Sequence, residues 1–275
     1  DAERVFCVYE ALKRGIDHQT IYRITKIDWW FLDKMQHLAD LEKGLAKCEG
    51  VLSEAQYKEA KKYGFQDKTI KRLAKVDKLP VENYRAGFKM VDTCAAEFSA
   101  NTPYFYSTYD GDNEAAEFIA EKEAKAAEKG EPRKKKVLVF GSGPIRIGQG
   151  IEFDYCSVHC VWTLKKNGCE AILVNNNPET VSTDFDTGDR LYFDPLNPES
   201  VDNIIATEKP DACVVQFGGQ TAIKLAKHMD DIGLPILGTP ADAIDEAEDR
   251  ERFDELLERC NIPLSLIHIS EPTRP

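Results

Sequence analysis

The sequence predicts an all-helical domain followed by a doubly wound parallel α/β sheet, within 275 residues. Two observations predict it. Apolar residues recur at helical spacing through most of the first 128 residues, whereas short apolar runs alternate with helix-length stretches from Val137 onwards. A hydrophobic content of 42% and a charged content of 31% are ordinary for a globular protein with a real core.

The first part is expected to contain several short helices. Val5, Val8 and Leu12 lie on one helix face, and Gly15 ends that helix. None of the helices is apolar all round, so they must pack on one another in a compact helical domain. Further helices are predicted over 17–27, after an N-cap at Asp28, after the capping box of Ser53 and Gln56 with Gly64 as its end, and from Asp67.

The segment 88–109 has no clear period and is rich in Tyr, Phe and small residues. We interpret it either as an ordered connector on the surface of another domain or as a plain buried loop. Residues 112–136 are rich in alanine and charge and end in four basic residues, which is typical of a solvated helix and a linker. The predicted boundaries are therefore 1–110 for the helical domain with its connector and 111–136 for the charged helix and linker.

The third part, 137–263, has the strand–helix alternation of a parallel sheet. Strands are predicted over 137–140, 171–174, 212–215 and 235–237, and helices up to Lys166 and over 199–208, 220–230 and 241–260. Ligands of such sheets gather at the carboxyl ends of the strands. The loops 141–150, 175–183 and 217–220 are expected to converge there.

The two ends of the sequence do not follow this pattern. Residues 1–10 lack Met and already have helical apolar spacing, so we expect the chain to begin within a longer protein. Residues 264–275 show neither a period nor a cap, and we interpret them as a non-native tail.

Charge and cysteine usage exclude several classes of protein. A formal net charge of −12 argues against broad binding of nucleic acid or anionic membranes, and no stretch approaches the roughly 20 apolar residues of a membrane span. The eight cysteines form no CxxC pair and no zinc-finger spacing with His. We expect free, buried thiols in a cytoplasmic protein that binds no metal.

The Gly-rich loop 141–150, GSGPIRIGQG, is the strongest local signal, because it follows a strand and precedes a helix. The dinucleotide pattern G-x-G-x-x-G fails, since Arg146 stands where the third Gly is needed and Asn175 to Asn177 replace the acidic residue after the second strand. The phosphate-loop pattern fails as well, because Gln149 and Gly150 replace its Lys and hydroxyl residue.

The other polar clusters carry no recognisable catalytic pattern. Glu152 and Asp154, two residues apart, do not share a helix face, and the acidic residues of 179–189 are typical of Asx turns and caps. Two glycines in the turn 217–221 allow close backbone approach, with Gln220 and Thr221 as a cap or a ligand contact. From residues alone, the prediction is a Rossmann-like domain with an unusual Gly-rich loop, plus a helical domain.

Longer motifs indicate a family. GSGPIRIGQGIEFDYCSVH (141–159), VNNNPETVSTDFDTGDRLYF (174–193), QFGGQTAIKLA (216–226) and AIDEAEDRERFDELL (243–257) closely resemble the large subunit of carbamoyl-phosphate synthase. KMVDTCAAEF (89–98) and YSTY (106–109) resemble the connector before its second synthetic half, and IDWWF (27–31) with its flanking helices resembles its oligomerisation domain. The resemblance covers about residues 1–263.

The resemblance implies an internal fragment: the oligomerisation domain, then the pre-ATP-grasp domain of the second half. The family makes carbamoyl phosphate from bicarbonate and glutamine-derived ammonia, for arginine and pyrimidine biosynthesis. It uses ATP with Mg²⁺ or Mn²⁺, and K⁺, in ATP-grasp domains that lie outside this sequence. We therefore expect no cofactor, no metal and no catalytic residue in the fragment, and no activity from it alone.

The resemblance also implies partners and a site. The partners are the ATP-grasp domains of the large subunit, the small glutamine amidotransferase subunit, and further copies through the helical domain. The site is a passage for carbamate, where glycine suits a space that any Cβ would narrow. Arg146 could neutralise an anion there or fix the loop through an ion pair, and both roles stay open. The predicted channel residues are Gly141, Gly143, Arg146, Gly148, Gln149, Gly150, Glu152, Asn177, Gly218, Gly219 and Gln220.

Two alternatives remain at this point. One is a non-catalytic module whose helical domain self-associates while the α/β domain docks. The other is a nicotinamide-dependent oxidoreductase, disfavoured by Arg146 and by the missing acidic residue.

Overall fold

A computed structural model describes residues 3–92, 95, 97–143, 150–177 and 180–263. The chain divides into two compact units, one ending at Arg85 and the other beginning at Ala86. The predicted tail, 264–275, lies outside the described residues, as do Asp1 and Ala2.

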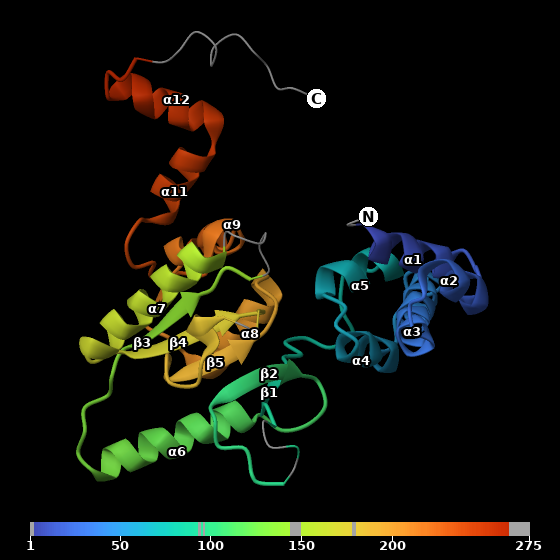
Figure 1. Cartoon of the computed structure of the whole chain (residues 1–275), viewed down its shortest axis with the longest axis horizontal. Helices are drawn as coiled ribbons and strands as arrows, with labels where there is room; N and C mark the ends of the chain where they lie inside the picture. The colour runs from blue at the N-terminus through green and yellow to red at the C-terminus, as the bar shows by residue number, and fades with distance from the viewer. Residues whose placement is uncertain (1–2, 93–94, 96, 144–149, 178–179, 264–275) are drawn as a thin grey trace. The chain divides into compact units, whose positions relative to one another are not determined.

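The first unit consists of short helices in its described part (Figure 1). Their starts follow the predicted caps: the Asp17 carboxylate accepts the Thr20 N–H at 2.8 Å, and Asp28 accepts the Trp30 N–H at 2.9 Å. The capping box of Ser53 and Gln56 is also confirmed. The helices are α1 (Arg4–Lys13), α2 (His18–Thr25), α3 (Trp29–Ala46), α4 (Glu54–Lys62) and α5 (Asp67–Ala74).

Two apolar clusters hold these helices together. The α1, α2 and α3 helices share one cluster, and α3, α4 and α5 share the other. Each helix buries only one face, which is why an isolated helix of this length would not be stable and packing must supply the stability. The buried members are Val8, Leu12, Ile21 and Leu32 in the first cluster, and Leu45, Tyr57, Ala60 and Ile70 in the second.

The second unit contains a six-stranded, mostly parallel sheet in the order β1-β2-β5-β4-β3-β6. Among the strands of the described residues, β1 and β2 pair antiparallel and the other neighbours pair parallel. Within the parallel part, the chain order of the strands across β5-β4-β3-β6 is 3-2-1-4, as in nucleotide-binding α/β sheets. The strands are β1 (Gly87–Met90), β2 (Tyr104–Thr108), β3 (Lys136–Phe140), β4 (Glu170–Asn175), β5 (Arg190–Phe193) and β6 (Ala212–Val214).

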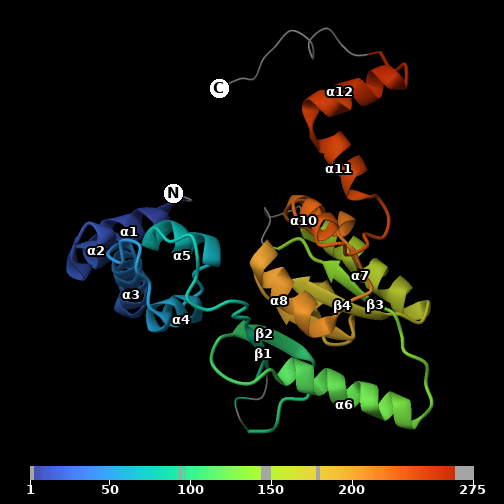
Figure 2. The ribbon, with the colours of Figure 1, turned by 180° about the vertical axis from the view of Figure 1, so that it is seen from behind.

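Helices cover both faces of this sheet (Figures 1 and 2). Val139 of β3 and Leu173 of β4 pack with Val161 of α7 on one face. Leu138 and its neighbours pack with α8, α9 and α10 on the other, which explains the uninterrupted apolar runs in the strands. The helices are α6 (Glu114–Glu128), α7 (Gly150–Lys166), α8 (Pro198–Glu208), α9 (Gly219–Ile223), α10 (Ala226–Asp231), α11 (Ala241–Glu248) and α12 (Arg250–Arg259), with 3₁₀ turns η1 (Val181–Thr183) and η2 (Gln216–Gly218).

The segment 88–109 contributes two strands to the sheet, so both interpretations of it, a surface connector and a plain buried loop, were wrong for these strands. Residues 87–90 and 104–108 form the hairpin β1–β2, and Phe88 and Phe105 are both 0% exposed. Phe88 packs edge-on against Tyr192 of β5, with ring centroids 4.9 Å apart. The two strands are separated by a long loop, so neither a tight-turn signal nor a period of two reveals them.

Four other elements differ from prediction. The strand β5 was missed, the predicted strand 235–237 is only a bridge between Cys213 and Ile236, and 220–230 forms two helices. The predicted helix 241–260 breaks at Asp249, whose backbone is extended (φ −79°, ψ 124°). Its carboxylate accepts the Arg252 N–H at 2.9 Å, so a residue within the helical pattern serves as an N-cap.

The described cysteines are all free, but their predicted burial is wrong for three of them. Cys213 is buried in β6, whereas Cys7, Cys156 and Cys260 are exposed on α1 and α7 and at the end of α12. Among the described residues no helix is both long and apolar enough to span a bilayer.

Candidate functional site

The three predicted loops meet at the carboxyl end of the sheet, between β3 and β6. The Gly141 N–H donates to the Val174 carbonyl at 2.8 Å, and the Gly143 N–H donates to the Asn175 side-chain oxygen at 3.0 Å. The turn after β6 approaches the same place, since a Cβ on Gly218 would lie 2.6 Å from the Gly141 carbonyl. This is the point where the strand order reverses, the usual position of a ligand crevice in such sheets.

Glycine is required here because neighbouring side chains and main chain leave no room for a Cβ. A Cβ on Gly141 would lie 2.6 Å from the Asn175 amide, closer than any real contact. Gly143 has φ +66°, a left-handed conformation that disfavours other residues. Among the described residues, the edge between these loops therefore combines main-chain groups with the side-chain amides of Asn175 and Asn176.

The helix α7 packs against the turn that follows β6. The Phe153 ring lies against Gly219, which a Cβ would approach to 3.3 Å, and Gly219 has φ +59°. The Asp154 carboxylate accepts the Ser182 N–H at 3.2 Å, and Asp189 accepts the Ala171 N–H at 2.9 Å. These two carboxylates therefore have the structural role predicted for them.

Of the remaining predicted channel residues, some lie at the Gly-rich edge, some point elsewhere, and some lie outside the described residues. Gly150 is the half-buried first residue of α7, and Glu152 is exposed in its first turn. Asn177 donates its backbone N–H to the Asn175 side chain at 3.2 Å, but the Gln220 side chain contacts Glu248 of α11 at 3.3 Å rather than the Gly-rich loop. Arg146, Gly148 and Gln149 lie outside the described residues.

The residue that joins the loops, Asn175, was not among the predicted channel residues. It is buried at the end of β4, and its side-chain oxygen accepts the N–H groups of both Gly143 and Asn177. The sequence offered one signal for this residue, a polar side chain at the end of an apolar strand. Because the carboxyl ends of parallel strands lie at one edge of the sheet, such a side chain lies beside the loops of that edge.

A second missed residue, Asp194, lies just after β5 at the same edge. Ser107 of β2 donates its hydroxyl to Asp194 Oδ1 at 2.8 Å, while Oδ2 is buried and has no hydrogen-bond partner among the described residues. Burial disfavours the carboxylate and raises the pKa of Asp194 to about 6, although the hydrogen bonds from Ser107 oppose this.

We expect Asp194→Asn to change how stability depends on pH. Because the folded pKa of about 6 exceeds the ordinary value of 3.8, ionisation of Asp194 destabilises the fold progressively as the pH rises from about 4 to 6. Asparagine removes this effect, so the unfolding free energy of the variant minus that of wild type should rise by roughly 2–3 kcal/mol between pH 4 and 7. Urea unfolding at several pH values measures it.

Ser107→Ala provides the matched control for that experiment. Loss of the hydroxyl that stabilises the ionised form should raise the pKa further and steepen the fall in stability with pH. A constant difference between Asp194→Asn and wild type across this pH range would contradict the assignment.

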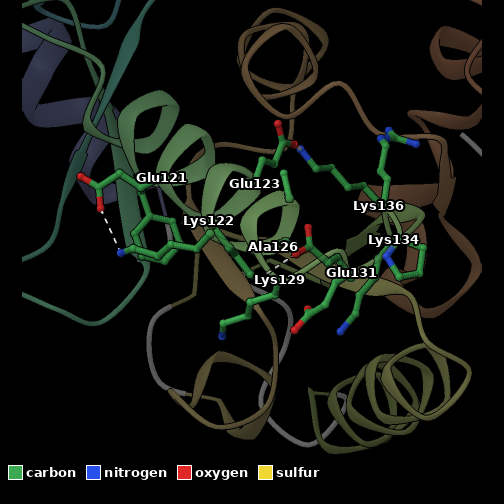
Figure 3. A pocket seen from close by; sticks show the side chains of 14 residues that line it. Glu121, Lys122, Glu123, Ala126, Lys129, Glu131, Lys134 and Lys136 are labelled. Carbon is green, nitrogen blue, oxygen red and sulfur yellow. Dashed lines mark hydrogen bonds and ion pairs between the residues drawn. The ribbon is translucent and has the colours of Figure 1, made fainter.

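A cavity of about 630 Å³ lies at the opposite, amino end of the sheet, beside α6 (Figure 3). Its lining mixes acidic and basic side chains, and Lys136 Nζ lies 2.8 Å from Glu123 and Lys122 Nζ 2.8 Å from Glu170. Burial opposes ionisation of Glu170, but hydrogen bonds from Lys122 and Arg190 outweigh it and lower the pKa of Glu170 to about 2. These ion pairs lie at the amino end of the sheet, whereas the Gly-rich loop lies at its carboxyl end.

The described residues contain no group of three or more His, Cys, Asp or Glu side chains that could hold a metal ion. The Gly-rich crevice also lacks the lysine of a phosphate loop, as the sequence shows.

Comparisons with known proteins assign both units. Residues 1–89 match the family model of the carbamoyl-phosphate synthetase large chain oligomerisation domain, and residues 133–246 match that of the carbamoyl phosphate synthase preATP-grasp domain. The two matches together span most of the chain, in the order that the motifs predicted.

Curated relatives agree with the domain matches. The carbamoyl phosphate synthase large chain of Lachnoclostridium phytofermentans is 54% identical over 270 residues, which cover 96% of this chain and 24% of that protein. The large chain of Agathobacter rectalis is 52% identical over 269 residues, with the same coverage. A solved biotin carboxylase domain of a thermophilic 2-oxoglutarate carboxylase has a TM-score of 0.36 and 21% identity over 47% of this chain and 28% of that one, too low to carry an argument.

The matched relatives are much longer than this chain. It spans 24% of the curated large chains that it matches, yet nearly all of it aligns with them. With both domain matches in sequence and about half of the residues identical, the chain belongs to the carbamoyl phosphate synthase large-chain family.

Proposed function

We propose that the chain is the central scaffold of a glutamine-dependent carbamoyl-phosphate synthase large chain. In this proposal an all-helical oligomerisation domain precedes a Rossmann-like pre-ATP-grasp sheet of the second synthetic half. The observation that carries it is the pair of consecutive family matches, 1–89 and 133–246, within relatives that align over 96% of the chain. The alternative of a nicotinamide-dependent oxidoreductase has no comparable support.

The parent reaction would be ATP-dependent synthesis of carbamoyl phosphate from bicarbonate and glutamine-derived ammonia, which serves arginine and pyrimidine biosynthesis in the cytoplasm. The ATP, the Mg²⁺ or Mn²⁺ and the K⁺ would bind to ATP-grasp domains outside this chain. The absence of a phosphate-binding lysine from the loop 141–150 supports the proposal that ATP binds outside this chain. Main-chain amides and the Asn175 side chain lie at this position instead.

The Gly-rich crevice would line the path of carbamate between active sites. Its support is geometric: the Asn175 side chain leaves no room for a Cβ at Gly141, and the Phe140 and Gly141 carbonyls leave none at Gly218. The described part of this edge offers amide N–H and C=O groups to a small polar cargo.

The partners would be the remaining large-chain domains, the small glutamine amidotransferase subunit, and further copies of the large chain. Self-association is supported by the description of the family that matches residues 1–89 and by the exposed Trp29, Trp30 and Phe31 at the start of α3. A purely non-catalytic self-associating module is the second candidate, which that same match favours.

The test uses the purified 275-residue chain beside a full-length large chain. We expect the full-length protein to hydrolyse ATP in a bicarbonate-dependent manner and the 275-residue chain to show none of this activity. Sedimentation of the short chain over a range of concentrations should reveal reversible self-association. Bicarbonate- or carbamate-dependent ATP hydrolysis by the short chain would overturn the proposal, and a strictly monomeric chain would remove its oligomerisation part.

A further inference from the structure

The cavity beside α6 is a feature that the proposed function does not use. Its volume of about 630 Å³ lies within the range of roughly 300–1,000 Å³ that is typical of small-molecule sites. One wall is the linker 129–135, which joins α6 to β3, and Phe118, Ala126 and Pro132 contribute apolar surface. None of its lining residues belongs to the Gly-rich loop at the carboxyl end of the sheet.

Hydrogen bonds fix the linker at both ends. At the end of α6, the Gly130 N–H donates to the Ala127 carbonyl at 3.0 Å, which closes the last turn of the helix. At the start of β3, Asp211 accepts the Lys136 N–H at 2.8 Å and lies 3.0 Å from the Arg133 guanidinium. A ligand therefore meets a preformed wall, and little ordering of the chain opposes its binding.

Two lysines of the lining differ from the other charged residues around the cavity. The acidic side chains of Glu121, Glu123 and Glu170 each pair with a lysine of the same lining, at 2.8–3.4 Å. Lys129 and Lys134 form no ion pair or hydrogen bond within the part of the chain that the structure describes. Figure 3 shows both on the segment that leads from α6 to β3. Their ammonium groups are available to an anion.

The charge that remains available around the cavity is positive on balance. Glu131 is the acidic lining residue without a partner among the described residues, so it opposes the two lysines with one negative charge. The C-terminal end of α6 adds roughly half a negative charge, which is less than the remaining positive one. Six basic and four acidic residues line the cavity, although the whole chain has a net charge of −12. The local charge therefore favours an anion.

We propose that this cavity binds a small soluble phosphate monoester with an apolar group. Lys129 and Lys134 hold the phosphate, whose charge of about −1.5 to −2 at neutral pH suits two ammonium groups better than the single charge of a carboxylate does. Phe118 and Pro132 contact the apolar group. The net charge of −12 disfavours an anionic membrane as the source of the phosphate. This site is independent of the proposed function.

Phenyl phosphate is the probe, because it joins a phosphate to an apolar ring. Isothermal titration calorimetry with the 275-residue chain at neutral pH should give a dissociation constant of roughly 0.1–1 mM. Inorganic phosphate lacks the ring and phenylacetate lacks the second charge, so each should bind about tenfold more weakly. Benzylamine, a cation with the same ring, should show no measurable binding.

Three variants test the assignment of the charges. Lys129→Ala with Lys134→Ala should weaken the binding of phenyl phosphate by about tenfold or more, because both charge-assisted hydrogen bonds are lost. Glu131→Gln should strengthen it by about threefold, because it removes a repelling charge. The matched control, Lys224→Ala with Lys227→Ala, removes two exposed lysines elsewhere in the same unit and should leave the dissociation constant unchanged. All five side chains are exposed, so the variants should fold, which circular dichroism checks.

Lysine acetylation read by mass spectrometry locates the bound probe. Phenyl phosphate should slow the acetylation of Lys129 and Lys134 and leave that of Lys224 and Lys227 unchanged. The inference is overturned if about 10 mM phenyl phosphate produces neither heat nor protection, or if the double variant of Lys129 and Lys134 binds as tightly as wild type. Equal protection of all four lysines, or binding of benzylamine as tight as that of phenyl phosphate, would also overturn it. No step of this test measures synthesis of carbamoyl phosphate, so its failure would leave the proposed function unaffected.

Discussion

Glu208→Gln is expected to lower the free energy of unfolding of the α/β unit by about 3–5 kcal/mol. Glu208 and Arg190 are both 0% exposed, and the guanidinium donates to both carboxylate oxygens, at 2.6 and 2.8 Å. Tyr192 donates its hydroxyl to the same carboxylate at 2.7 Å. Burial lowers the pKa of Arg190, but Glu208 and Glu170 outweigh this and raise it, so the variant leaves a full positive charge poorly compensated in the core.

Urea unfolding followed by circular dichroism measures the loss. Glu128→Gln, which removes an exposed carboxylate at the end of α6, should change stability by less than about 0.5 kcal/mol. The double variant Arg190→Leu with Glu208→Leu should recover much of the loss, because removing both charges avoids leaving one unpaired. A single variant no less stable than the double one would contradict the assignment of a buried, mutually dependent pair.

Gly218→Ala is expected to destabilise the same unit by about 3 kcal/mol and to disturb the candidate crevice. The new Cβ would lie 2.5 Å from the Phe140 carbonyl and 2.6 Å from that of Gly141. Both oxygens belong to the end of β3 and the loop after it, and main chain held in a sheet cannot move aside as a flexible side chain can. The turn after β6 must therefore shift away from β3.

Two glycine controls separate space from backbone conformation. Gly44 lies in α3 with no atom near its would-be Cβ, so Gly44→Ala should stabilise the chain by about 0.5–1 kcal/mol. Gly233 is equally open but has φ +74°, so Gly233→Ala should cost about 1 kcal/mol through strain alone. If Gly218→Ala cost no more than Gly233→Ala, the close approach of the two strand ends would not be the reason for that glycine. Thermal melts of all three variants provide the comparison.

Local patterns in the sequence determined most of the helical unit and the parallel strands. Caps such as Asp17 and Ser53 act within three residues, and the runs 137–140 and 171–174 need burial on both faces whatever their neighbours are. The convergence of three loops at one edge also followed from strand order along the chain, because parallel strands place their carboxyl ends together.

Contacts between residues far apart in the sequence determined the features that the sequence did not predict. Arg190 begins β5 as a charged residue, and its burial is tolerable because the carboxylates of Glu208, at the end of α8, and Glu170 pair with it. Residues 88–109 contain the hairpin β1–β2, since Phe88 has a partner in Tyr192, about 100 residues away, that no local period can reveal. The same holds for Asn175 and Asp194, whose roles come from loops and strands brought to them.

The sequence by itself therefore determined the family and a glycine-rich edge without a nucleotide-binding signature. Only the tertiary structure decided that Asn175 joins the loops of this edge and that the hairpin belongs to the sheet. It also decided that the linker after α6 borders a cavity in which Lys129 and Lys134 have no partner among the described residues. The reason is physical: periodicity and caps act over one or two turns, whereas burial depends on which distant surface arrives.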